Sequence, residues 1–184
     1  YLTDQGLAKL KGQTTLQQLF LSQQVGITDI GLEHLKGLTA LRILNLAETP
    51  IGDSNLEALS TLKTLQQLDL SGTRVTSAGL EHIKTLTALV ELKLSESTVN
   101  DMGLAHLKPL TNLQRLDLAN TEVGSAGLES LVGLKLQELQ LAANEAAEKA
   151  TEEQLRVKSV KFRSSCYFSS ASQECLRAGI NTTV

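Results

Sequence analysis

The sequence predicts an α/β solenoid, a curved array in which short parallel strands alternate with short helices. Leucines recur in several columns with a period of about 24 residues, as between Leu65 and Leu89. Such self-similarity at a short fixed period is typical of repeat architectures. Only 3% of the residues are aromatic, so we expect the core to be built from regularly stacked aliphatic side chains.

Each repeat is expected to begin with a short strand. Three apolar columns lie at offsets one, four and six, and the last two alternate as in a strand with one buried face. The columns are Leu16, Leu41, Leu65, Leu89, Leu113 and Leu136; Leu19, Leu44, Leu68, Leu92, Leu116 and Leu139; and Leu21, Leu46, Leu70, Leu94, Leu118 and Leu141. Because a single strand cannot bury its face alone, we expect the strands to stack into one parallel sheet.

A turn and a short helix are expected to follow each strand. A short polar side chain at offset nine could satisfy backbone groups where the chain leaves the strand. A later column of Asp and Ser is predicted to supply helix N-caps. These columns are Gln24, Thr49, Thr73, Ser97, Thr121 and Asn144, and Asp4, Asp29, Asp53, Ser77, Asp101 and Ser125.

The helices are expected to lie on the outside of a curved molecule. Leucine or isoleucine pairs spaced i, i+3, such as Leu80 and Ile83, place one apolar stripe of each helix inward. Neighbouring strands lie about 4.8 Å apart, whereas packed helices need roughly 8–10 Å. The strands should therefore form the concave face and the helices the convex face.

These columns resemble those of leucine-rich repeat proteins, as in LxxLxLxxTxVxxxGLxxLxxL. The wording TDxGLxxLKxLTxL is most similar to short bacterial repeats of the helix-bearing, ribonuclease-inhibitor-like kind. The resemblance extends from Leu2 to about Asn144. It implies a horseshoe-shaped arc and a protein-binding role, but no particular partner.

The C-terminal segment departs from the repeat. We divide the chain into leucine-rich repeats at 1–144 and a capping region at 145–184, composed of a helix, a seventh strand and a short helix. Val157, Val160 and Phe162 match offsets one, four and six and predict that strand, which brings the sheet to about seven strands. A terminal repeat with an altered outer face is what a solenoid needs at its end.

Catalytic and metal-binding motifs are absent from the pattern, so we predict neither an enzyme nor a cofactor. His34, His82 and His106 are copies of one convex column and do not converge on a point, as catalysis requires. Cys166 and Cys175 could form a disulfide or remain free thiols in the cap, and a metal or redox pair is a third alternative.

Two exposed columns of the concave face are the candidate binding site. Unlike the core columns, they vary from repeat to repeat, as expected of a surface adapted to a partner. The candidate residues are Phe20, Ile43, Asn45, Gln67, Asp69, Glu91, Lys93, Arg115, Asp117 and Gln140. Phe20 and Ile43 form an apolar pair on a polar face, which is typical of an interface hot spot.

A second interpretation of the same columns is open. Asp69, Lys93 and Asp117 alternate in sign on successive strands, as do Glu91, Arg115 and Glu138. Lateral pairs between strands would stabilise the sheet by about 0.2–1 kcal/mol each. On that interpretation, the charges satisfy one another and need no partner.

The function predicted from these observations is a non-catalytic scaffold that binds a protein on its concave face. A recognition arm of a larger effector or ubiquitin-ligase-type protein and a structural or surface-display repeat are the alternatives. A net charge of −3 is too small to indicate nucleic-acid or membrane binding, and we expect a monomer. The sequence favours neither a secreted or cell-surface location nor a cytoplasmic one.

The capping interpretation makes a first prediction. Deleting residues 157–184 should expose the last strand edge and the open leucine core, and the truncated chain should aggregate or partly unfold. Light scattering and thermal denaturation measure both effects. A truncated chain that stays monomeric with an unchanged Tm would argue against a cap.

Overall fold

The computed structural model describes residues 2–141 and 161–163, and it contains one parallel sheet with its strands in sequence order. The seven strands are β1 (Gln18–Phe20), β2 (Ile43–Asn45), β3 (Gln67–Asp69), β4 (Glu91–Lys93), β5 (Arg115–Asp117), β6 (Glu138–Gln140) and β7 (Lys161–Arg163). Each strand pairs only with its neighbours along the chain, so the sheet is open. The predicted α/β solenoid is confirmed.

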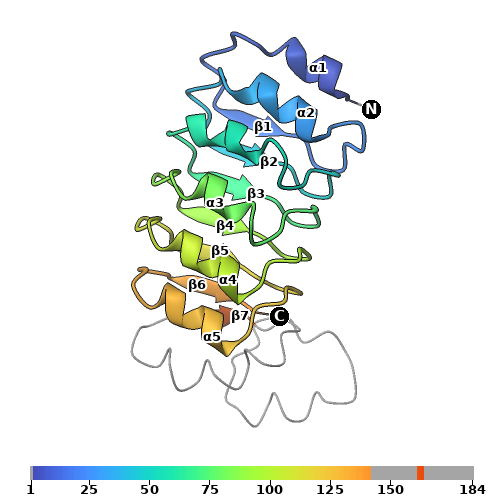
Figure 1. Cartoon of the computed structure of the whole chain (residues 1–184). Helices are drawn as coiled ribbons and strands as arrows, with labels where there is room; N and C mark the ends of the chain where they lie inside the picture. The colour runs from blue at the N-terminus through green and yellow to red at the C-terminus, as the bar shows by residue number, and fades with distance from the viewer. Residues whose placement is uncertain (1, 142–160, 164–184) are drawn as a thin grey trace.

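A layer of short helices covers one side of the sheet (Figure 1). Its α-helices are α1 (Asp4–Ala8), α2 (Asp29–Leu32), α3 (Leu80–Ile83), α4 (Asp101–Leu104) and α5 (Ser125–Leu128), and its 3₁₀ helices are η1 (Glu33–Leu35), η2 (Leu56–Thr61), η3 (Ala105–Leu107) and η4 (Glu129–Leu131). In three repeats, a single α-turn tightens directly into a 3₁₀ turn. We call the opposite surface the strand face; it is formed by the outward residues of β1–β6, and it is the predicted concave face.

The core lies between the two layers as one continuous cluster of aliphatic side chains. The middle residue of each strand from β2 to β6 points into it, and these leucines are aligned by strand register, as in the pair Leu68 and Leu92. At the N-terminal end, Leu16 and Leu19 are only partly buried. Their equivalents Leu41 and Leu44 have a repeat on each side and are fully buried.

The polar column at offset nine behaves as predicted for its hydroxyl members. Thr49, Thr73 and Ser97 are buried, and each hydroxyl donates a hydrogen bond of 2.6 Å to the carbonyl three residues earlier. Thr121 makes the same bond at 2.7 Å. The bond satisfies a carbonyl inside the turn of the same repeat.

The predicted N-cap column is wrong, because these side chains bind the next repeat instead. The Asp53 carboxylate accepts hydrogen bonds from the backbone N–H and the hydroxyl of Thr76, at 2.9 and 2.6 Å. Asp4 binds Thr28 in the same way. In α1, α2, α4 and α5 the N-cap is instead the residue just before this column; Thr28, for example, accepts from the N–H of Ile30.

Glycines in the helical layer leave space for this column. A Cβ atom on Gly103 would lie 2.7 Å from Oγ and 2.9 Å from Cα of Ser77. The same substitution at Gly31, Gly79 or Gly127 would meet the Asp of the preceding repeat. None of these four glycines has a positive φ, so their role is space between repeats and not conformational freedom.

The seventh strand is present, but its predicted register is shifted by two residues. Phe162 pairs with Leu139 and Lys161 with Glu138, whereas the apolar pattern had placed Val160 beside Leu139. The predicted helices of the capping region and both cysteines, Cys166 and Cys175, lie outside the described residues. The domain boundary at 144/145 and the capping role stay predictions.

The buried leucine ladder makes a second prediction. Leu92→Ala should lower the free energy of unfolding by about 2–5 kcal/mol, because a cavity would form between two packed neighbours. Chemical denaturation measures the loss, and Lys108→Ala, at an exposed position, is the control. A loss below about 0.5 kcal/mol would contradict the burial of Leu92.

The glycine column makes a third prediction with an internal control. Gly103→Ala should destabilise the fold by about 1–3 kcal/mol through overpacking, although alanine is the better helix former. Gly37→Ala should be neutral or slightly stabilising, because a Cβ atom there meets nothing within 4 Å. Equal melting temperatures for the two variants would contradict this account of the spacing.

Candidate protein-binding surface

All ten candidate residues lie on the strand face, at the first or third position of a strand. Ile43, Gln67, Glu91 and Arg115 open β2 to β5, and Phe20, Asn45, Asp69, Lys93, Asp117 and Gln140 close β1 to β6. The six strands span roughly 24 Å at about 4.8 Å per step, so no single pocket contains all ten. The structure instead brings them into two shallow depressions.

The first depression lies at the N-terminal end and contains the apolar pair. Phe20 is 62% exposed and Ile43 is half-buried. The two are diagonal neighbours, since Phe20 pairs with Asn45 and Gln18 pairs with Ile43. They line a hollow of about 130 Å³ together with Asn45, Gln67, Asp69, Glu91 and Lys93. An aromatic ring beside a hollow is suited to contact an apolar side chain of a partner.

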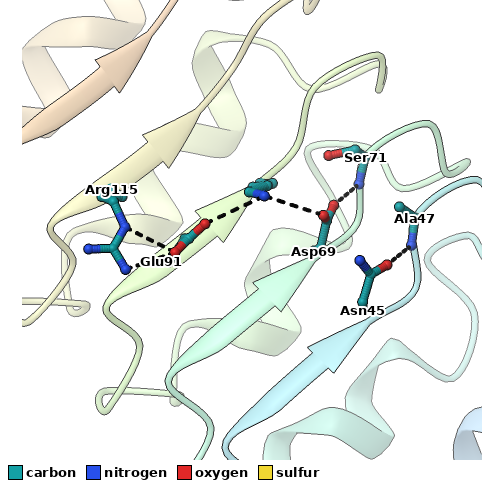
Figure 2. Close-up of polar contacts among 7 residues, drawn as sticks. Asn45, Ala47, Asp69, Ser71, Glu91 and Arg115 are labelled. Atoms are coloured by element: carbon teal, nitrogen blue, oxygen red, sulfur yellow. Dashed lines mark hydrogen bonds and ion pairs between the residues drawn. The ribbon is translucent and has the colours of Figure 1, made fainter. Parts of the chain in front are cut away.

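Three of the candidates also shape the turn at the end of their strand, and Figure 2 shows Asn45 and Asp69 among them. Asn45 accepts a hydrogen bond from the N–H of Ala47 at 2.9 Å, and Asp69 accepts one from Ser71 at 3.0 Å. Asp117 does the same with Ala119. The side-chain oxygen of Asn45 and one carboxylate oxygen of each Asp are thus held by the nearby backbone. This bond fixes the side chain and leaves the Asn45 amide nitrogen and the second oxygen of each Asp for further contacts.

Each cation of the strand face forms the predicted ion pair with the acid on the preceding strand, but not with the acid on the following strand. The Nε and Nη2 atoms of Arg115 donate to Oε2 of Glu91 at 2.9 and 2.8 Å (Figure 2). Lys93 lies 3.8 Å from Asp69 and 3.5 Å from Glu91. Among the described side chains, neither cation lies within 4 Å of Asp117 or Glu138. The charges of the strand face therefore satisfy one another only in part.

The second depression lies over β4, β5 and β6. It has a volume of about 270 Å³, and its polar lining consists of Glu91, Lys93, Arg115, Asp117, Glu138 and Gln140. Glu138 was missing from the predicted site, although it occupies the same column as Glu91 and Arg115. Its column membership was visible in the sequence, but the depression that it lines was not.

Asp117 has an unusual environment within this depression. Burial raises the pKa of its carboxyl above the ordinary value, and the nearby Asp69 carboxylate acts in the same direction. The Ala119 N–H and the Lys93 ammonium lower the pKa, but they do not cancel the effect of burial. A second positive charge placed beside Asp117 would therefore stabilise its ionised form.

The histidines are spread through the helical layer. His34 lies in η1, His82 in α3 and His106 in η3, at equivalent positions of different repeats. Within the described residues, no group of three or more His, Cys, Asp or Glu side chains is arranged to hold a metal ion. No helix in that part of the chain has the length and apolar character needed to cross a bilayer.

Comparison with known proteins agrees with this architecture. A leucine rich repeat family model matches residues 14–75, and a second leucine rich repeat model matches residues 110–132. A crystal structure of an internalin C2 from Listeria monocytogenes is similar, with a TM-score of 0.68 and 25% sequence identity. The similarity covers 89% of this chain and 76% of that one. No curated protein sequence matches the chain.

The chain is therefore a leucine-rich repeat protein, an open α/β solenoid like that internalin. Proteins of this class typically mediate protein interactions and are typically non-catalytic. The narrower resemblance to ribonuclease-inhibitor-like repeats stays a prediction. The helical layer consists of short α-helices and 3₁₀ helices of three to six residues, so each repeat carries little helix.

Proposed function

We propose that the chain is a non-catalytic scaffold that binds a protein partner on its strand face. The observation that carries the proposal is the apolar pair at the N-terminal end of that face. Phe20 keeps 62% of its surface exposed beside a hollow that Ile43 also lines. Exposed apolar surface that is rimmed by polar groups is typical of interaction sites.

The rigidity of the sheet supports the same proposal. The strands β2 to β6 are each hydrogen-bonded to a neighbouring strand on both sides, so their outward side chains stand on a fixed backbone. Several side chains are further fixed by turn bonds or ion pairs, such as Asp69 with Ser71 and Arg115 with Glu91. Side chains held in this way lose little conformational entropy when they bind a partner.

The helical layer is the less suitable surface. Its exposed apolar residues are single side chains of different repeats: Ile30 lies in α2, Met102 in α4 and Val132 directly after η4. Scattered exposed apolar residues are normal on soluble surfaces. The strand face, in contrast, combines a fixed framework with side chains that change from repeat to repeat.

This proposal makes a fourth prediction. The partner for this test is a protein that is captured with the chain and then purified. Phe20→Ala should weaken its binding by about 2 kcal/mol or more, as expected for a hot spot. The matched control is Met102→Ala, which removes an exposed apolar side chain from the helical layer and should leave the Kd unchanged. Isothermal titration calorimetry measures both values.

Hydrogen–deuterium exchange on the complex gives an independent test of the surface. Protection should appear in β1 to β5. Protection confined to the helical layer, together with normal binding by the Phe20→Ala variant, would show that the partner uses the other surface.

A further inference from the structure

The two cations of the strand face both turn toward the N-terminal end of the sheet. Arg115 stands in register between two acids, Glu91 on β4 and Glu138 on β6. Both of its hydrogen bonds go to the same oxygen of Glu91. Within the described part of the chain, no ion pair within 4 Å joins it to Glu138.

Lys93 shows the same asymmetry one column away. It stands in register between Asp69 and Asp117. Its ammonium lies within 4 Å of Asp69 and of Glu91. No described side chain forms an ion pair within 4 Å with Asp117. Among the described side chains, Asp117 and Glu138 thus have no ion-pair partner within 4 Å, and the Lys93 ammonium acts on Asp117 only from a longer distance.

These two carboxylates line the same depression, the hollow of about 270 Å³ over β4 to β6. In the register of the sheet, Asp117 pairs with Gln140, two residues beyond Glu138. From strand spacing and rise, the Cα atoms of Asp117 and Glu138 lie about 8 Å apart. Since one oxygen of Asp117 is held by the Ala119 N–H, the carboxylate is oriented before any ligand arrives.

We propose that this depression receives an arginine side chain of the protein partner, whose guanidinium donates to both Asp117 and Glu138. The inference rests on the proposed function, because it assigns the charge of the partner at one end of the strand face. A guanidinium has donors on more than one edge and suits two separated carboxylates, whereas an ammonium is a single point charge. The guanidinium would give Asp117 and Glu138 the close ion pair that neither Lys93 nor Arg115 forms with them.

The test uses nuclear magnetic resonance titration of the full chain with a capped glycine-arginine-glycine peptide. Amide signals of Asp117, Ala119, Glu138 and Gln140 should shift together and give one Kd. The Asp117→Asn/Glu138→Gln variant should bind about tenfold more weakly. The control variant Glu57→Gln/Glu122→Gln removes the same charge from exposed positions outside the depression and should keep the parent Kd within about twofold.

Two further measurements test whether the binding is specific for arginine and whether a cation of the chain itself already occupies the depression. A glycine-lysine-glycine peptide should bind more weakly than the arginine peptide. Lys161 occupies the register position beside Glu138 on β7, so the titration is repeated with Lys161→Gln. Equal affinity for both peptides, equal loss in both double variants, or arginine binding only after Lys161→Gln would each overturn the proposal.

The pH dependence gives an additional readout. Burial raises the pKa of Asp117, and a bound guanidinium favours the ionised carboxylate. Arginine binding should therefore weaken as pH falls through that pKa. The charged groups around Asp117 on the described strands are Asp69 on β3 and, lining the depression, Glu91, Lys93, Arg115 and Glu138. A Kd that does not change over this range would contradict a contact with Asp117.

Failure of this inference can be told apart from failure of the proposed function. Loss of partner binding in Phe20→Ala, combined with no arginine binding, would mean that the strand face recognises a partner of different chemistry. Arginine binding, combined with a partner footprint on the helical layer, would overturn both the proposed function and the role of the depression in it.

Discussion

Every feature of this molecule depends on one constraint: a repeat can bury its leucines only against the repeats beside it. The described core is a single cluster that runs from Leu7 to Leu141. In the first repeat, which has a described neighbour on one side only, Leu16 and Leu19 are only partly buried. Stability is therefore a property of the interfaces between repeats more than of any repeat alone.

The same constraint assigns most side chains before function can act on them. The strand leucines fill the core, the hydroxyl column satisfies a carbonyl in each turn, and the Asp and Ser column binds the next repeat. Gly103 and its equivalents are small because that column needs space. The strand face is the surface on which residues such as Phe20 and Lys93 can differ between repeats without disturbing these contacts.

The sequence was sufficient to predict the strands and the layers, because leucine columns such as Leu68 and Leu92 report burial directly. The prediction for the Asp column was wrong, because an Asp side chain is equally suited to cap its own helix or to accept hydrogen bonds from another repeat. The choice depends on the distance between repeats, which the local sequence does not contain. The shift at Phe162 has a similar origin: Val160 and Phe162 both fit the apolar pattern. In the candidate site, the columns predicted which residues share a face. The choice of Arg115 between Glu91 and Glu138 is set by side-chain geometry, which no column reveals.

The in-register parallel ladder has a mechanical consequence. Its hydrogen bonds between strands run along the axis of the stack, as in the bond from Leu70 N–H to the Lys93 carbonyl. A force that separates the two ends of the array would load these bonds one row at a time, not all together. The array should then peel open in steps, and each step would release one repeat of extended chain, about 80 Å. Such a molecule would yield gradually under tension and lengthen while its remaining repeats stay folded.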